Sequence, residues 1–238
     1  MSVSNQPHRP TTNQLLLALS EPEYQRLVPH LERVELELKQ VLYKAGEPIT
    51  HVYFPEQSMV SLVINQSGGS TVEAGIVSND GMVGISVILG SNTTTTTAVV
   101  QIAGSGMRMK SEHLVAEFNR VRELHSLLLR YTQTLLTQVT QTLACNSFHT
   151  IEKRLARWLL LVSDRMQSDT FVLTQEFLAQ MLGCRRTGVT EVAGAFSRAG
   201  IISYSRGNIN ILNRSDLENT SCQCYGITKN EYKQLLGV

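Results

Sequence analysis

Two short helices joined by a tight turn are predicted over residues 173–194, and this pair constrains the fold more than any other stretch of the chain. Thr174 has the hydroxyl of a helix N-cap, which accepts a hydrogen bond from a free backbone N–H at the start of a helix. Gly183 can adopt the positive φ that ends one helix and redirects the chain. Counted from Gln175, a fixed series of apolar, small and glycine positions is filled by Leu178, Ala179, Leu182, Gly183, Cys184, Val189 and Val192.

This pattern is typical of a helix-turn-helix, in which the second helix lies in the major groove of DNA and its first residues meet base edges. Ala179 is small because the two helices cross closely at that position. The first turn of the second helix exposes Arg185, Arg186 and Thr187. The alternative, two amphipathic helices of an ordinary α-domain, requires neither the small residue nor the glycine.

A β-hairpin is predicted directly after the second helix. Residues 201–204 and 209–212 are rich in β-branched side chains and flank Ser205-Arg206-Gly207-Asn208, which favours a turn at Gly-Asn. Beside a helix-turn-helix such a hairpin is a wing, and Arg206 at its tip can reach a phosphate or the minor groove. Residues 149–238 carry 11 Lys and Arg against 8 Asp and Glu, a mildly basic balance compatible with phosphate contacts.

The length and composition indicate a soluble globular protein with room for two modest cores. The chain has 238 residues, of which 42% are hydrophobic and 17% charged. It contains no apolar run of the roughly 20 residues that a membrane-spanning helix needs, and its first dozen residues lack the apolar core of a signal peptide. We therefore expect a flexible tail over residues 1–12, a cytoplasmic location and no membrane partner.

Short strands are predicted in the first half of the chain. Apolar or alternating runs are separated by turn clusters, including residues 65–70, and occupy residues 34–42, 51–54, 59–64, 71–77, 98–103 and 106–110. Two short helices, one opening at Asn13 and one near Pro22, precede them. This spacing predicts a small antiparallel barrel or sandwich. The five threonines of residues 93–97 fit a polar loop leading into a strand.

A helix of more than 30 residues is predicted over residues 112–146. Apolar side chains advance along it by threes and fours, at Phe118, Val121, Leu124, Leu128, Tyr131, Leu135, Val139 and Leu143. A stripe on a helix this long is most simply a two-fold dimer interface. The alternative is a helix packed only on its own barrel.

A further helix is predicted after Asn146, with an inner stripe at Ile151, Leu155, Trp158, Leu159 and Val162. This spacing leaves Lys153, Arg154 and Arg157 toward solvent. Two roles stay open for these cations: they solvate that face of the helix, or they contact phosphates.

The four cysteines all lie in the second half of the chain. Cys184 falls on an apolar position of the helix pair and is expected to be a buried thiol. Cys222 and Cys224 can bind metal or become oxidised, but nothing near them in the sequence completes a zinc or iron–sulfur ligand set. We therefore expect a structural or incidental role, with no metal and no cofactor. The chain also lacks a nucleophile–base motif and a phosphate-binding glycine loop, so no enzymatic activity is expected.

The order of these elements resembles the family of the cyclic-AMP receptor and the fumarate–nitrate reduction regulator, the Crp/Fnr family. The likeness rests on Tyr43-Lys-Ala-Gly-Glu-Pro48, Asp80-Gly-Met-Val-Gly84, Glu152-Lys-Arg-Leu-Ala-Arg-Trp158 and residues 173–194. It implies an α+β fold with an antiparallel β-roll sensor over 13–111, a dimerisation helix over 112–146 and a winged helix-turn-helix over 147–238. It further implies a homodimeric transcription regulator whose partners are DNA, a second copy of the chain and RNA polymerase.

The resemblance also implies which residues meet DNA. Arg186 takes the main base-reading place, where an arginine can bind guanine O6 and N7 together. Its expected neighbours on the same helix are Arg185, Thr187, Thr190 and Glu191, and Thr174 and Gln175 are expected against the DNA backbone. Glu191 departs from the arginine of the cyclic-AMP receptor, so the target sequence of that protein is not carried over.

The sensor departs from the nucleotide-binding members of the family. Those members use Gly-Glu for the ribose and Arg-Ser/Thr-Ala for the cyclic phosphate, where this chain has Gly84-Ile85 and Thr96-Thr97-Ala98. Without the arginine there is no charge-assisted, bidentate hold on a phosphate. We expect either an unidentified small-molecule effector beside Gly84, Ile85, Thr96 and Thr97, or a constitutive protein.

Two other hypotheses concern the mechanism of the sensor and the function of the whole chain. An oxygen-sensing iron–sulfur cluster needs several cysteines in the N-terminal part, whereas the first cysteine here is Cys145. The alternative function is a ligand-binding module that acts through protein partners and keeps the helix-turn-helix only as a packing unit. Such a module would have no salt-dependent affinity for DNA.

Overall fold

The computed structural model describes residues 9–65 and 71–237. Residues 1–8 of the expected tail and residues 66–70 of the expected turn cluster lie outside the described part. Arg9 forms an ion pair with Glu21 at 3.1 Å, and the backbone N–H of Thr12 donates to Glu56 Oε1 at 3.1 Å. These contacts attach the start of the described chain to the body of the protein.

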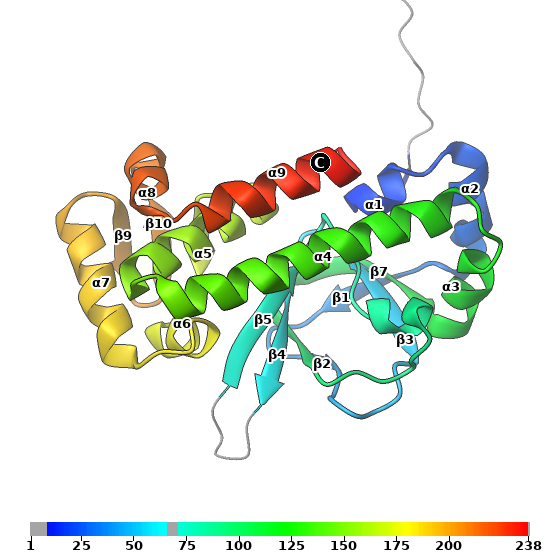
Figure 1. Cartoon of the computed structure of the whole chain (residues 1–238), viewed down its shortest axis with the longest axis horizontal. Helices are drawn as coiled ribbons and strands as arrows, with labels where there is room; N and C mark the ends of the chain where they lie inside the picture. Colours follow the sequence, from blue (N-terminus) through cyan, green and yellow to red (C-terminus); the bar gives the residue numbers. More distant parts are fainter. Residues whose placement is uncertain (1–8, 66–70, 238) are drawn as a thin grey trace, which may run out of the picture.

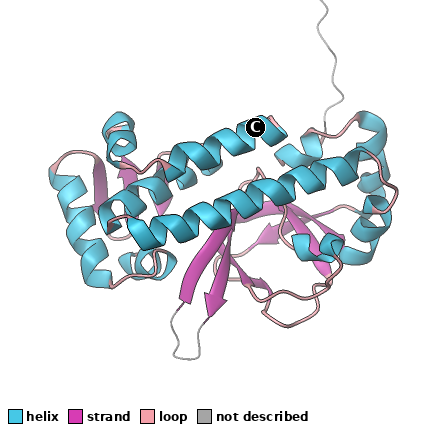
Figure 2. Ribbon diagram, in the orientation of Figure 1, coloured by secondary structure: helices cyan, strands magenta, loops and turns pink. Residues whose placement is uncertain are grey.

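The N-terminal half is a β-roll preceded by short helices (Figures 1 and 2). The leading helices are α1 (Gln14–Leu17), α2 (Glu21–Leu27) and the 3-10 turn η1 (Val28–His30). The strands are β1 (Glu32–Leu36), β2 (Val41–Tyr43), β3 (His51–Pro55), β4 (Met59–Asn65), β5 (Thr71–Val77), β6 (Thr97–Ile102) and β7 (Gly104–Lys110), with the 3-10 turn η2 (Ile85–Leu89) between β5 and β6.

These strands form two antiparallel sheets, which confirms the predicted β-roll. One sheet has the order β1-β7-β3 and the other β2-β6-β4-β5. The run predicted over residues 34–42 is divided between the two sheets, because the chain turns at Lys39 with a φ of 68°. Apolar side chains from both sheets meet in one core, among them Leu36, Phe54, Val60, Ala98, Val100 and Met109.

The single long helix predicted over residues 112–146 is wrong. The structure has α3 (Ser111–Phe118) and α4 (Glu123–Phe148), separated by a turn in which Val121 has a φ of 53°. Val121 is 71% exposed, so it belongs to no packed stripe although its spacing fits one. The helical spacing of apolar residues continues through this turn. For that reason periodicity alone predicted one helix where the structure has two.

The apolar stripe predicted for dimerisation packs largely inside the chain. Leu124, Leu128, Tyr131 and Leu135 are buried in the core of the β-roll. The Tyr131 hydroxyl donates to the carbonyl of Met82 at 2.9 Å. These residues pack α4 against the β-roll of its own chain, as the alternative predicted. They are therefore not available as a dimer interface.

The C-terminal half contains the predicted winged domain and two additional helices. Its elements are α5 (Ile151–Met166), β8 (Thr170–Val172), α6 (Gln175–Met181), α7 (Arg186–Arg198), β9 (Ile202–Ser205), β10 (Asn208–Ile211), α8 (Arg214–Thr220) and α9 (Cys224–Leu236). Helix α9 lies alongside α4 (Figure 1). Arg130 of α4 donates to the Leu235 carbonyl at 2.9 Å, and Gln138 donates to the Tyr232 hydroxyl at 3.3 Å.

The winged domain packs against the outer face of the four-stranded sheet. Met59, Val63 and Ile76 of β4 and β5 share one hydrophobic core with α5, α6 and α7. The turn at Gly183 also approaches this sheet, since a Cβ on Gly183 would lie 3.0 Å from Val72 Cγ2. The second core is therefore continuous with the sensor.

Two of the cations expected in solvent on α5 are buried. Arg154 is 9% exposed and Arg157 is 5% exposed, whereas Lys153 is exposed as predicted. The expectation failed because α5 is covered on more than one side, by the β-roll and by the other elements of the winged domain. A single inner stripe cannot reveal a helix that is enclosed by tertiary packing.

Glu73 of β5 connects the sensor to α5 through hydrogen bonds. Trp158 Nε1 donates to Glu73 Oε1 at 2.9 Å, and the Ser61 hydroxyl donates to Glu73 Oε2 at 2.7 Å. Burial raises the pKa of Glu73 to about 7, and the hydrogen bonds from Ser61 and Trp158 and the charges of Arg157 and Arg165 oppose that rise. The carboxyl group therefore titrates near neutral pH.

A buried ion pair joins the two halves at a second place. Arg165 Nε of α5 lies 2.7 Å from Asp80 Oδ2, with side-chain exposures of 6% and 12%. The guanidinium also stacks over the Tyr232 ring of α9, 5.2 Å from its centroid. Arg165 of α5 therefore contacts both the loop after β5 and the C-terminal helix α9.

We expect Asp80→Asn to lower the free energy of unfolding by about 3 kcal/mol, because the change leaves the Arg165 charge buried without its partner. Denaturant unfolding at pH 7 measures the loss. Glu32→Gln is the control, since Glu32 pairs with Arg108 at 2.7 Å but is 63% exposed, and it should cost less than about 1 kcal/mol. Equal losses in the two variants would contradict the assignment of a buried interdomain pair.

Glu73→Gln should change the pH dependence of stability. The folded state holds the Glu73 proton up to about pH 7, against an ordinary pKa of 4.5, so it binds more protons than the unfolded state within this window. Stability of the wild type therefore falls as the pH rises from about 5 to 7, by about 3 kcal/mol from this group. The glutamine variant should lack that contribution, so that it gains stability relative to the wild type between pH 5 and 8. A difference that stays constant over this range would contradict the assignment.

Candidate nucleic-acid interface

The first helix of the predicted pair, α6, begins and ends where the sequence indicates. The Thr174 hydroxyl accepts a hydrogen bond from the backbone N–H of Phe177 at 3.2 Å, which caps the helix. The turn that follows contains Gly183 with a φ of 57°. Leu178, Ala179 and Leu182 are buried, as the pattern requires.

The second helix, α7, has Arg185 at its N-cap and Arg186 as its first residue. Val189, Ala193 and Phe196 form its buried face. Gly188 packs against α5 so closely that a Cβ would lie 2.7 Å from Ile151 Cδ1. Cys184 precedes the helix and is half-buried against the second core. The opposite face of α7 is consequently turned toward solvent.

The residues expected to read DNA lie on this solvent-facing side. Exposed side chains at the start of α7 are Arg185, Arg186, Thr187, Thr190 and Glu191. The Thr190 hydroxyl donates to Gln175 Oε1 at 2.7 Å, which links the starts of α6 and α7. Thr174 is exposed beside Gln175, so the structure brings all of these residues to one surface.

The predicted wing is the hairpin of β9 and β10. Its turn residues are Arg206 and Gly207, both with positive φ (50° and 86°), rather than the predicted Gly-Asn pair. Two consecutive residues of this kind form the turn type that matches strand twist. The Gly207 carbonyl accepts from the Leu173 N–H at 2.6 Å, so the wing is fastened beside α6. A third strand, β8, pairs with β10 and was not predicted from the sequence.

The electrostatics of this surface favour an anion. Arg185, Arg186 and Arg206 are exposed, and none of them pairs with a carboxylate within residues 9–65 and 71–237. The N-terminus of α7 adds the partial positive charge of its free N–H groups. Burial raises the pKa of Tyr204 in the wing, and the charge of Arg186 opposes that rise. Helix α7 and the wing therefore lie within electrostatic range of each other.

Of the four residues predicted to border an effector, Gly84 and Ile85 lie at the start of η2, and Thr96 and Thr97 lie where β6 begins. Gly84 has a φ of 98° and precedes η2, with Ile85 half-buried against the β-roll core. The Thr96 hydroxyl lies 3.3 Å from that of Thr94. Thr97 accepts from the Ala45 N–H at 3.2 Å, and of the four it alone lines the cavity described next.

A cavity of about 570 Å³ lies between the four-stranded sheet and α6. Its sensor side includes Thr97, Val99 and Val63, and its other side includes Phe177 and Met181. The sequence did not suggest this position, because it depends on how the winged domain packs against the sheet. A molecule bound here would touch the sensor and the first helix of the pair at once.

Comparisons with known proteins identify both halves of the chain. Residues 33–120 match the family model of the cyclic nucleotide-binding domain, and residues 153–220 match that of the Crp-like helix-turn-helix domain. Together the two matches cover more than half of the chain. The chain belongs to the Crp/Fnr family of transcription regulators. No curated protein matches it.

Solved structures of this family share the fold. FixK2 from Bradyrhizobium japonicum is 17% identical with a TM-score of 0.71, and the match covers 81% of this chain and 98% of that one. A putative Crp/Fnr regulator from Eubacterium rectale is 17% identical with a TM-score of 0.68, covering 87% and 96%. The c-di-GMP responsive global regulator CLP from Xanthomonas campestris is 15% identical with a TM-score of 0.67, covering 81% and 99%.

Among residues 9–65 and 71–237, no helix combines the length and the apolar character that crossing a membrane requires. Folding brings Cys145 and His149, which are distant in the sequence, to Cys222 and Cys224. The only signal in the sequence was the spacing of Cys145 and His149 by four residues, one helical turn, and their partners lie more than 70 positions away.

Proposed function

We propose that this regulator binds a pseudo-palindromic DNA site as a homodimer and reads its bases through α7. The observation that carries the proposal is the exposed pair of guanidinium groups on Arg185 and Arg186, at the free N-terminal end of a helix whose other face is buried. A helix end of this kind, presented beside a wing, is suited to the major groove.

The two ends of the surface have different roles in this proposal. Arg186 reaches guanine O6 and N7, which contributes about 1–3 kcal/mol of discrimination between bases. Arg206, at the tip of the wing, contacts phosphate or the minor groove and contributes affinity with little sequence preference. Thr190 and Gln175 hold each other and fix the spacing of the two helices.

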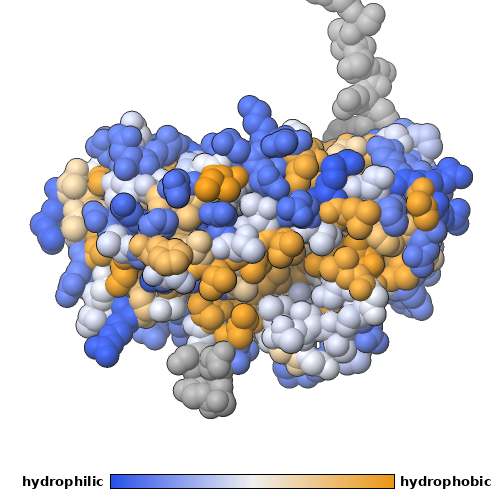
Figure 3. Space-filling model, in the orientation of Figure 1, coloured by the Kyte–Doolittle hydropathy of each residue, from blue (hydrophilic) through white to orange (hydrophobic). Residues whose placement is uncertain are grey.

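Helix α4 supports the homodimer through an exposed face that shares only Leu143 with the predicted stripe. Leu129, Leu136 and Leu143 are spaced by seven residues and are 45%, 56% and 68% exposed. Gln133 and Thr140 alternate with them on the same exposed face. Figure 3 shows hydrophobic residues in a band along the course of α4. Leucine at every seventh position fills the d positions of a coiled-coil heptad, and the uncharged Gln133 and Thr140 fall at the a positions.

The charge of α4 agrees with a covered face. Its 26 residues include only two formal charges, Glu123 and Arg130. A long helix face exposed to water is ordinarily rich in charge. Pairing of two α4 helices about a two-fold axis would relate the two α7 helices by symmetry, as half-sites about 34 Å apart require.

Regulation in this proposal passes through the contact between the sensor and the winged domain. A ligand in the cavity beside Thr97 would alter the packing of α6, and with it the pose of the recognition helix. Cyclic nucleotide in the mode of the family is not the proposed ligand, because Ile85 and Thr96 stand where those members have glutamate and arginine. The contact with RNA polymerase that the family likeness implies stays a prediction.

Selection of binding sites from a random DNA pool tests the proposed function. Enrichment of a two-fold related sequence is expected, with affinity that falls steeply as salt concentration rises. Failure to enrich any sequence, together with no salt-dependent affinity of the full chain for DNA, would favour the alternative of a module that acts through protein partners.

Arg186→Ala and Arg206→Ala should weaken DNA binding in different ways. Arg186→Ala should reduce discrimination between the selected site and a site with its guanines replaced, by about 10- to 100-fold. Arg206→Ala should weaken binding to both sites about equally and lower the slope of log affinity against log salt by about one unit. Titrations of each variant on both sites measure this, and identical effects of the two substitutions would contradict the division of roles.

Leu136→Glu should convert the dimer to a monomer, because the two-fold axis would place two carboxylates in an apolar seam. We expect dimerisation to weaken by more than about tenfold. Leu38→Glu is the matched control, since Leu38 is 59% exposed in the sensor and away from α4. Sedimentation at several concentrations measures both. A Leu136→Glu protein that remains dimeric would place the dimer interface elsewhere.

A further inference from the structure

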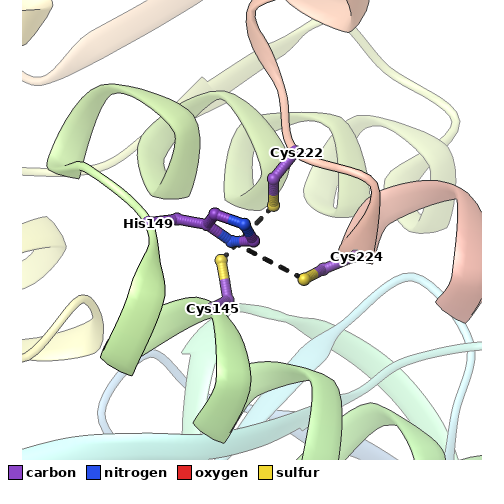
Figure 4. Close-up of side chains that lie close together, drawn as sticks. All are labelled: Cys145, His149, Cys222 and Cys224. Carbon is purple, nitrogen blue, oxygen red and sulfur yellow. Dashed lines mark hydrogen bonds between the residues drawn. The ribbon is translucent and has the colours of Figure 1, made fainter.

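Four side chains with metal-binding atoms converge where α4 ends and α9 begins (Figure 4). Cys145 lies in the last turn of α4, and His149 is the residue at its C-cap. Cys222 lies in the link between α8 and α9, and Cys224 is the first residue of α9. All four ligand atoms lie within 4.8 Å of one another.

The distances suit one ion at the centre of a tetrahedron. Cys145 Sγ lies 3.5 Å from Cys222 Sγ, and Cys224 Sγ lies 3.7 Å from His149 Nδ1. With Zn–S bonds of about 2.3 Å and Zn–N bonds of about 2.0 Å, tetrahedral geometry separates ligand atoms by about 3.5–3.8 Å. A disulfide between Cys145 and Cys222 would employ only two of the four groups.

The surroundings of the sulfurs differ from those of an ordinary buried thiol. Cys145, Cys222 and Cys224 are 1%, 6% and 2% exposed, and they form a cluster of their own, separate from the two hydrophobic cores. Packing as small apolar side chains would explain their burial. It would not explain the imidazole of His149, whose Nδ1 is directed at Cys224.

A buried cation, Arg157, lies beside the cluster. Arg157 is 5% exposed, its Nε has no hydrogen-bond partner, and it pairs with no carboxylate of the described residues. Its Nη2 donates at 3.2 Å to Thr142, one turn before Cys145 on α4.

We propose that Cys145, His149, Cys222 and Cys224 bind one Zn²⁺ as a closed, tetrahedral site. Three thiolates and a neutral imidazole give the complex a net charge of −1, which would compensate the buried Arg157. Binding would release up to three protons from the thiols to solvent, with no change of oxidation state.

The donor set selects zinc over other ions. Thiolate and imidazole ligands favour zinc over magnesium or calcium, which prefer oxygen. An iron–sulfur cluster binds its cysteines to different iron atoms, so those sulfurs stand further apart than the ones here. Four protein ligands leave no open position for substrate, which makes this a structural site.

The site would fasten the C-terminal helix to the joint between the two halves of the chain. Helix α4 ends at Phe148, and α5 begins at Ile151, so His149 lies in the short link between the sensor's helix and the winged domain. From this point α9 returns along α4, where Thr137 donates to Glu231 at 3.2 Å. The consequence for DNA binding rests on the proposed function: the metal would hold the winged domain in one orientation relative to α4.

Metal analysis of the purified full chain tests the site directly. The protein, produced with zinc in the medium and its metal measured by mass spectrometry, should carry one zinc per chain. Cys222→Ser and His149→Ala should each lose most of it. Cys184→Ser is the matched control, because Cys184 lies outside the cluster, and it should retain the full amount. A wild-type chain without zinc, or a Cys184→Ser variant that loses it equally, would overturn the proposal.

A second measurement uses wild-type protein, so it does not depend on whether the ligand variants fold. Wild-type protein loaded with Co²⁺ in place of zinc should show the intense visible absorption of a tetrahedral thiolate site, and Cys184→Ser should show it unchanged. Wild type that lacks this absorption, and whose intact mass is two hydrogens lower with Cys145 joined to Cys222, would make the cluster a redox pair and overturn the proposal. Neither readout requires DNA, so loss of DNA binding alone would leave the zinc site standing.

Discussion

The packing of the winged domain on the outer face of the four-stranded sheet is the contact on which the rest of the structure depends. Met59, Val63 and Ile76 exclude water together with α5, and this burial places Glu73 against Trp158 and Asp80 against Arg165. Apolar burial supplies the attraction, while the buried polar groups fix one relative orientation, because each would lose its partner in another. The β-roll and the winged domain are therefore coupled by direct side-chain contacts as well as by the link between α4 and α5.

Helix α4 has three faces with different surroundings. One face is buried in the β-roll through Leu128 and Tyr131, and a second carries α9 through contacts such as Arg130 with Leu235. The third is the exposed face of Leu129, Leu136 and Leu143. The proposed zinc site lies at the end of this helix, next to the short link that leads into α5. The proposed dimer and the proposed zinc site would thus act on the same element.

The sequence predicted best what local chemistry determines. A threonine cap, a small residue, a glycine at positive φ and a spaced apolar face specify α6 and α7 within a few residues of chain. Features that depend on distant packing were missed: the turn at Val121 preserved helical spacing, and Arg154 and Arg157 were buried by elements that no helical pattern contains. The approach of Cys145 to Cys222 belongs to the same class, since 77 residues separate them.

The central claim is that two symmetry-related α7 helices touch guanine edges in successive major grooves. Methylation interference at guanine N7 on the selected site tests it most directly, because a methyl group there blocks the contact that Arg186 is assigned. The account predicts two sets of interfering guanines, related by two-fold symmetry and about one helical turn apart. Interference confined to a single set, or binding that is indifferent to N7 methylation throughout the site, would contradict it.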